Sequence, residues 1–171
     1  MARRFRRGRA ADANCWTRVT GIYPLPETGE KACTAMTRKD FQRLTRLRLN
    51  DARTLLKNGN NEGAYYLTGL AVECALKAAI ARRTQRHEFP PKPTIVRGIY
   101  DHDLNKLLVV AGLETALEAA TTNNAELKQN WGLVKDWTVE SRYLAAGLSA
   151  DVLYRAATGR NGVLGWLRQH W

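Results

Sequence analysis

Residues 62–87 are apolar on almost every side of the helix that their sequence favours. At 100° per residue, small residues fall on one side and larger aliphatic residues fall on the sides that flank it. The small residues are Ala64, Thr68, Ala71, Ala75 and Ala78, and the larger ones are Leu67, Leu70, Val72, Leu76 and Ile80. A helix that is hydrophobic all round is buried, and small side chains let a neighbouring helix approach closely. The stretch is therefore predicted to be the central helix of a bundle.

Other amphipathic stretches supply the neighbours of this helix. Thr37 is a plausible N-cap for a helix over residues 38–58, and Asp101 for a helix that ends at Gly112. A loop with Pro90, Pro91, Pro93 and Gly98 precedes Asp101, because proline at that density cannot continue a helix. Further helices are expected over residues 114–120, 124–144, 152–157 and 163–171.

No stretch shows the sustained period-two alternation of a β-strand, so no sheet is expected. The predicted fold is all-α, an up-and-down bundle of four to five main helices plus short helices, because short connections imply antiparallel neighbours. A chain of 171 residues has the length of a single domain.

The three cysteines have no tight spacing, which argues against a disulfide framework or a CxxC metal site and favours a reducing, cytoplasmic compartment. Glu73 and Lys77 interrupt the longest apolar run, and a membrane span needs about 20 mostly apolar residues. The sequence is therefore not expected to span a membrane.

The formal charge of +11 is unevenly distributed. Residues 1–39 hold nine Lys or Arg and three Asp or Glu, with little hydrophobic periodicity. Residues 1–36 are expected to be a basic extension, and residues 37–171 the helical bundle. Such an arm can bind nucleic acid through phosphate contacts. It can equally be a disordered, solvated tail or sequence upstream of the natural start, and the residues favour this second interpretation.

Arg48 is an anomaly, because it lies inside the apolar face of the first predicted helix, between Leu44 and Leu55. A buried arginine is costly unless it is paired, and Glu73 is the natural candidate partner. Arg48 then has a structural role, either in an ion pair or with its aliphatic stem packed while its guanidinium reaches water. Alternatively, Arg48, Glu73 and Lys77 edge a polar cleft. Glu73 and Lys77 are four residues apart on one side of their helix, a side that is more often merely solvated.

Other signals of chemistry are weak. His87, His102 and His170 show neither HxxxH nor HExxH spacing, so no metal site is expected, and His102 is placed at a helix start after Asp101. Phosphate-binding glycine loops are absent, and no cofactor is expected. The C-terminal aromatics have helical spacing, so most are predicted to be core residues: Trp131, Trp137, Tyr143, Tyr154, Trp166 and Trp171.

Several segments, taken in order, resemble the HEPN family (higher eukaryotes and prokaryotes nucleotide-binding domain). They are Leu47–Leu56, Glu62–Ala78, His102-Asp103-Leu104 with Leu107-Leu108, Trp137 through Arg142-Tyr143, and Gly162-Val163-Leu164 with Trp166. The resemblance covers the chain from about Met36 to the C-terminus. It implies a helical bundle that often dimerises so that two clefts face each other. It also implies partnership with small nucleotidyltransferases, and several members are metal-independent ribonucleases.

The ribonucleases of the family carry an arginine and a following histidine that are separated by four to six residues. The matching arginine is Arg142, but Gly147, Leu148 and Ser149 include no histidine. The resemblance therefore implies a non-catalytic or accessory protein that binds a nucleotide, RNA or a nucleotidyltransferase partner. Its expected binding residues are Arg48, Glu73, Lys77, Arg142 and Tyr143. The alternatives are a toxin-like ribonuclease that takes its histidine from elsewhere, and a purely structural interaction module.

Overall fold

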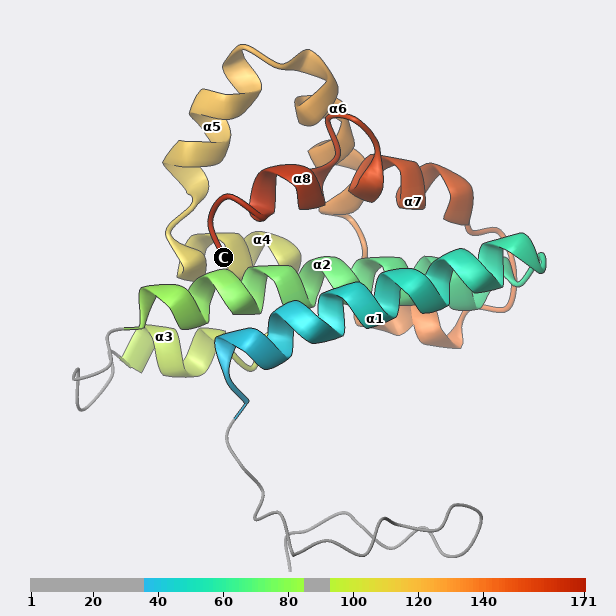
Figure 1. Cartoon of the computed structure of the whole chain (residues 1–171), viewed down its shortest axis with the longest axis horizontal. Coiled ribbons are helices and arrows are strands. Elements are labelled where there is room, and N and C mark those ends of the chain that lie inside the picture. Colours follow the sequence, from blue (N-terminus) through green and yellow to red (C-terminus); the bar gives the residue numbers. More distant parts are fainter. Residues whose placement is uncertain (1–35, 85–92) are drawn as a thin grey trace, which may run out of the picture. The chain divides into compact units, whose positions relative to one another are not determined.

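The computed structural model describes residues 36–84 and 93–171, and all regular structure in these residues is helical. The chain enters an antiparallel pair of helices, α1 (Arg38–Lys57) and α2 (Asn61–Arg83), which lie side by side in Figure 1. Thr37 caps α1 as predicted, because its hydroxyl accepts from the Asp40 amide while the Asp40 carboxylate accepts from the Thr37 amide at 2.9 Å. Gly59, in the left-handed region at φ 76°, turns the chain into α2.

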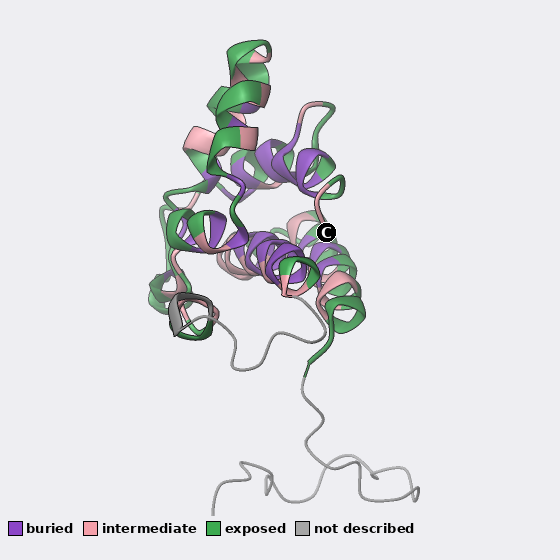
Figure 2. Ribbon diagram, turned by 90° about the vertical axis from the view of Figure 1, so that its left-hand side faces the viewer, coloured by how far each residue is buried: buried purple, intermediate pink, exposed green. Residues whose placement is uncertain are grey.

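Helix α2 is the centre of the bundle, as predicted. It packs against α1, α4 (Leu104–Ala111), the 3₁₀ helix η1 (Val139–Tyr143), α7 (Ala150–Thr158) and α8 (Val163–Leu167). More than half of its residues are buried, and they cover most of its circumference (Figure 2). The side with Tyr66, Leu70, Lys77 and Ala81 is only partly buried. By length and composition alone α2 could cross a membrane, but 67% of its apolar window is buried inside the bundle. The all-α bundle predicted from the sequence is therefore confirmed.

The remaining elements are α3 (Pro93–Gly98), α5 (Glu114–Thr122) and α6 (Ala125–Val134). The sequence pattern assigns residues 93–98 to a loop, and that prediction is wrong because Pro93 stands at the first helical position, where its missing N–H is no loss. The N-cap of α4 is Asp103 and not Asp101, since the Asp103 side chain accepts from the amides of Asn105 and Lys106.

The helix predicted over residues 124–144 is two elements. Helix α6 ends at Val134, and η1 begins at Val139 after Thr138 adopts an extended backbone. The break lets Trp137 turn inward, where its side chain is fully buried against Gly69 of α2. Burial of a large indole outweighs the modest helical propensity of the segment. The sequence pattern could not distinguish this arrangement from a continuous amphipathic helix.

Some predictions fall outside the described residues. These are the character of the extension over residues 1–35 and the state of Cys15 and Cys33. The central helix, predicted to reach His87, ends at Arg83 instead, because Thr84 adopts an extended backbone. Cys74, within α2, is a buried free thiol as expected. Burial, and next the charge of Glu73, raise the pKa of this thiol to about 11, so Cys74 is expected to resist alkylation while the protein is folded.

Candidate functional site

A buried ion pair occupies the middle of α2. Lys77 Nζ lies 2.8 Å from Glu73 Oε1, and the two side chains are only 12% and 4% exposed. The prediction that this is the solvated side of α2 is therefore wrong. A carboxylate this deeply buried needs compensation by charge and hydrogen bonds, so Glu73 and Lys77 form a structural and electrostatic centre.

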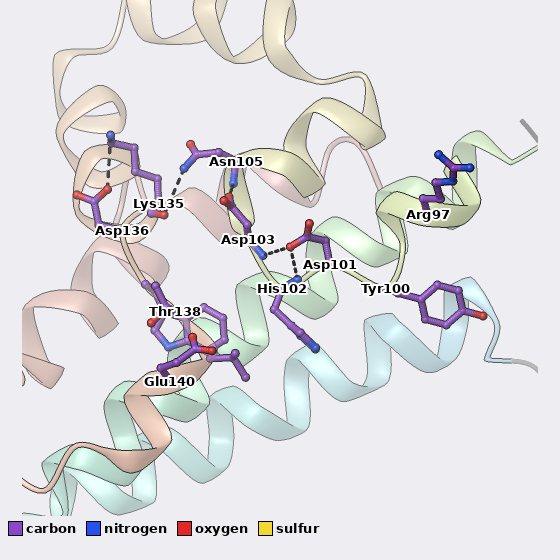
Figure 3. A pocket seen from close by; sticks show the side chains of 12 residues that line it. Arg97, Tyr100, Asp101, His102, Asp103, Asn105, Lys135, Asp136, Thr138 and Glu140 are labelled. Carbon is purple, nitrogen blue, oxygen red and sulfur yellow. Dashed lines mark hydrogen bonds and ion pairs between the residues drawn. The ribbon is translucent and has the colours of Figure 1, made fainter. Parts of the chain in front are cut away.

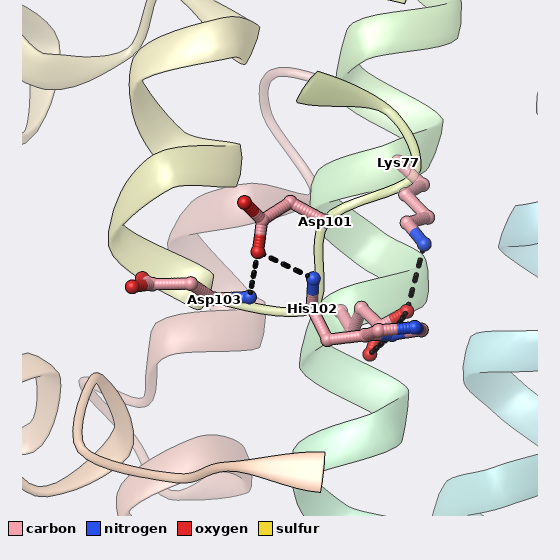
Figure 4. A network of polar contacts seen from close by, with 5 residues as sticks. Lys77, Asp101, His102 and Asp103 are labelled. Carbon is pink, nitrogen blue, oxygen red and sulfur yellow. Dashed lines mark hydrogen bonds and ion pairs between the residues drawn. The ribbon is translucent and has the colours of Figure 1, made fainter. Parts of the chain in front are cut away.

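His102 reaches this centre from the turn that precedes α4. Asp101 Oδ1 accepts from the amides of His102 at 2.8 Å and Asp103 at 2.9 Å, as Figure 4 shows. The hydrogen bond from the Asp103 amide is the largest cause of the lowered pKa of Asp101, and an ion pair with Lys106 at 3.1 Å also contributes. The turn that carries His102 therefore lies between two carboxylates. Asp101 bonds to the backbone of the turn, and Asp103 caps α4.

The imidazole of His102 bonds to both carboxylate oxygens of Glu73. His102 Nδ1 lies 3.0 Å from Oε1 and 3.1 Å from Oε2. An ionised carboxylate only accepts hydrogen bonds, so the proton is assigned to Nδ1. In the neutral ring this leaves Nε2 as an acceptor, on a side chain that is 52% exposed. Glu73 thus orients an accessible histidine through a buried contact.

His102 also lines a pocket of about 680 Å³ between the α3–α4 connection and the α6–η1 connection (Figure 3). Arg97 and Tyr100 stand at one end of the pocket, and Lys135 and Asp136 stand at the other. The remaining lining residues are Asp101, Asp103, Asn105, Trp137, Thr138, Val139 and Glu140. The pocket is therefore a polar site with an aromatic edge and separate cationic groups.

The charges in the pocket are partly committed to contacts within the protein. Asp101 and Asp103 hold the turn around His102, and Lys135 lies 3.5 Å from Asp136. Arg97 forms no ion pair with any other described residue, and Tyr100 is exposed with its ring at the rim. The groups without such commitments are thus the guanidinium of Arg97, the phenol of Tyr100 and the Nε2 atom of His102, while the ammonium of Lys135 is shared with Asp136. Within the described residues no group of three or more His, Cys, Asp and Glu side chains could hold a metal ion.

Arg48 does not pair with Glu73, and that prediction is wrong. Arg48 Nη1 bonds to Asp51 Oδ2 at 2.9 Å, three residues along α1, with both side chains partly exposed. Lys77 reaches Glu73 more readily than Arg48 does, because Lys77 follows Glu73 by one helical turn on the same face of α2. The Glu73 carboxylate therefore needs no cation from α1. Arg48 still stands near this region, since its charge contributes weakly to the pKa of Cys74.

Arg142 and Tyr143 belong to η1, which packs on α2. The Arg142 guanidinium carbon lies 4.7 Å from the centroid of the Tyr143 ring, an arrangement typical of a cation–π contact. Tyr143 is 76% exposed, so among the C-terminal aromatics it departs from the predicted core role. Neither residue lines the pocket described above; Glu140, two residues before Arg142, does.

The five residues predicted from the sequence do not form one site: Glu73 pairs with Lys77, Arg142 stacks on Tyr143, and Arg48 pairs with Asp51 instead. Sequence reasoning missed His102, which it placed at a helix start, together with Arg97, Tyr100 and Lys135. A usable signal for His102 was present: Glu73 lies on an apolar helix and needs partners. The other three carry no signal, because only the folded connections between helices bring them to one pocket.

Searches for similar proteins found no match among protein-family models, curated proteins or solved structures.

Proposed function

We propose that this chain is a non-catalytic, accessory protein of HEPN type that binds a nucleotide or an RNA terminus in the pocket beside His102. The observation that carries this proposal is the pocket itself, which combines Arg97 and Lys135 with an exposed tyrosine and an oriented histidine. Guanidinium and ammonium groups bind phosphate, and an aromatic ring can stack on a base. Its size, about 680 Å³, suits a ligand of nucleotide dimensions.

The acidic groups of the pocket are compatible with such a ligand. Glu140 and Asp136 present carboxylate oxygens that can accept hydrogen bonds from ribose hydroxyls. Arg97 and Lys135 stand at opposite ends, so phosphate and sugar would meet different parts of the wall. The resemblance adds three elements to the proposal: a homodimer, a nucleotidyltransferase partner and a cytoplasmic location. Arg48, Arg142 and Tyr143, whose side chains are exposed or partly exposed, are proposed to contribute to the partner-facing surface, whereas Lys77 is held in the buried pair with Glu73.

Binding of ATP, GTP and short single-stranded RNAs to the full chain is expected in titration calorimetry at low salt. Replacing both Arg97 and Lys135 with glutamine should weaken binding at least about tenfold, because each charge-assisted hydrogen bond contributes roughly 1.5–3 kcal/mol. Lys128→Gln, an exposed lysine on α6 outside the pocket, is the matched control and should bind like the wild type. Absence of heat with every ligand would remove the proposal, and equal binding by the double variant would move the site elsewhere.

A ribonuclease is the second candidate, and one observation favours it. Glu73 fixes the ring of His102 so that Nε2 faces outward, which is the orientation of a general base or acid. The family ribonucleases need such a histidine, and this chain lacks one after Arg142. Under our proposal, labelled RNA incubated with the protein in EDTA stays intact. Cleavage that is abolished by both His102→Ala and Arg142→Ala would replace the accessory function with catalysis.

A further inference from the structure

Helix α1 carries five exposed cations along a single line: Lys39, Arg43, Arg46, Arg53 and Lys57. At 100° per residue all five fall within about 40° of one direction on the helix. With a rise of 1.5 Å per residue, they extend over about 27 Å of helix length. We refer to these five residues as the α1 stripe.

The α1 stripe faces away from the bundle. The buried residues of α1 are Thr45, Leu49 and Ala52, which lie on the opposite and adjoining sides of the helix and pack toward α2. Most of the apolar face of α1 is therefore used inside the protein, and the face presented to solvent carries the five cations, with Leu47 beside them as the exposed large apolar residue of the helix.

The acidic residues of α1 do not neutralise the stripe. Asp51 bonds to Arg48, which lies off the stripe, and Asp40 is engaged by Thr37 in the cap of the helix. Hydrogen bonds from Thr37 are the main cause of the lowered pKa of Asp40, and the charge of Arg43 adds only a smaller contribution. Within the described residues, no member of the α1 stripe forms an ion pair.

We propose that the α1 stripe is a docking surface for the phosphodiester backbone of single-stranded RNA. Five cations on one line, without interspersed carboxylates, match the regularly spaced charges of a phosphate backbone, and counterion release drives such binding. The stripe contains no aromatic side chain, so it reads charge and not base identity. A membrane surface fits less well, because a helix that binds lipid needs a continuous apolar face for the bilayer, and α1 exposes only one large apolar side chain, Leu47.

This surface is distinct from the pocket beside His102, and it does not depend on nucleotide binding there. The pocket is formed by the α3–α4 and α6–η1 connections, none of which belongs to α1. The stripe can therefore bind RNA whether or not the pocket accepts a nucleotide, and the two proposals can fail separately.

The test compares two triple variants of the full chain. The stripe variant is Arg43→Gln, Arg46→Gln and Arg53→Gln; the control variant is Lys128→Gln, Arg160→Gln and Arg168→Gln, which removes the same charge from exposed positions elsewhere. Binding of a fluorescein-labelled oligouridylate is measured by anisotropy from about 50 to 200 mM salt. The stripe variant should lose on the order of 10²-fold in affinity at the lowest salt. Its log–log salt slope should fall by about 2, from three lost contacts at about 0.7 each.

Three outcomes decide the proposal. A loss confined to the stripe variant, with affinity retained when the same arginines become lysines, supports an electrostatic docking surface, because lysine keeps the charge. Equal losses of RNA affinity in both triple variants overturn the proposal, because the net charge of the protein would then explain the binding. A stripe variant that loses binding to vesicles of anionic lipid but keeps RNA binding overturns it in favour of a membrane surface. Circular dichroism and the melting temperature of each variant report its fold, and Lys39→Gln with Lys57→Gln repeats the test at the helix ends.

Discussion

Lys77→Met is expected to lower the free energy of unfolding by about 3 kcal/mol, because it leaves the Glu73 carboxylate buried without its cationic partner. For a bundle of this size the melting temperature should fall by about 10 °C. His102 remains as a hydrogen-bond partner of Glu73, which keeps the loss from being larger. Chemical denaturation followed by circular dichroism measures the change.

The two halves of this pair are not equivalent. Glu73→Gln should cost less than Lys77→Met, since the lysine is on a flexible stem and can carry its ammonium toward water, whereas the glutamate is 4% exposed. The double variant Glu73→Gln, Lys77→Met removes both charges and should recover much of the loss. If Lys77→Met alone were as stable as the wild type, the buried pair would have no structural role.

An exposed pair of the same spacing is the control for this experiment. Arg155 and Asp151 form an i, i+4 ion pair on α7, with side chains 70% and 67% exposed. Solvent screening makes such pairs nearly neutral, so Arg155→Met should stay within about 0.5 kcal/mol of the wild type. The difference between the two Met substitutions isolates the effect of burial from that of removing a helical ion pair.

The sequence was most informative where periodicity and burial agree. The all-round apolarity of residues 62–87 predicted the central helix, and Thr37 predicted where α1 begins. The break after Val134 was not predictable, because the residues around it keep helical spacing while Trp137 is drawn out of the helix by burial against α2. Local pattern is overridden where one large side chain gains more from tertiary packing.

The candidate site was predicted only in part, for the same reason. Glu73 could be singled out because a carboxylate inside an apolar helix requires a partner, but the choice among partners depends on distance in the fold. The sequence pattern favoured Arg48 on the preceding helix, whereas the structure supplies Lys77 from the same helix and His102 from a turn 29 residues further on. Residues on separate connections, such as Arg97 and Lys135, meet only when the bundle closes.

Gly69→Ala is expected to destabilise the protein by about 2–4 kcal/mol, although alanine is the better helix former. A Cβ atom at Gly69 would lie 2.2 Å from three atoms of the Trp137 indole, which is 1% exposed and rigidly packed. The ring has to shift as a whole, because a fused aromatic system has no flexible end that can yield. A shifted indole loses part of its contact with the Tyr66 ring, whose centroid lies 6.0 Å from that of Trp137. Thermal and chemical denaturation of the purified variant measure the loss.

Gly132→Ala provides the matched comparison, because Gly132 also lies inside a helix, α6, and its Cβ would meet no atom within 4 Å. That variant should be unchanged or more stable by up to about 1 kcal/mol. The double variant Gly69→Ala, Trp137→Leu should cost less than the sum of its parts, since the smaller side chain removes the clash. Additive losses would mean that the glycine matters for another reason. Trp137 also lines the pocket. The methyl group that Gly69→Ala adds should displace the Trp137 ring, so the same variant should bind nucleotide more weakly. The packing of α2 is in this way linked to the proposed site.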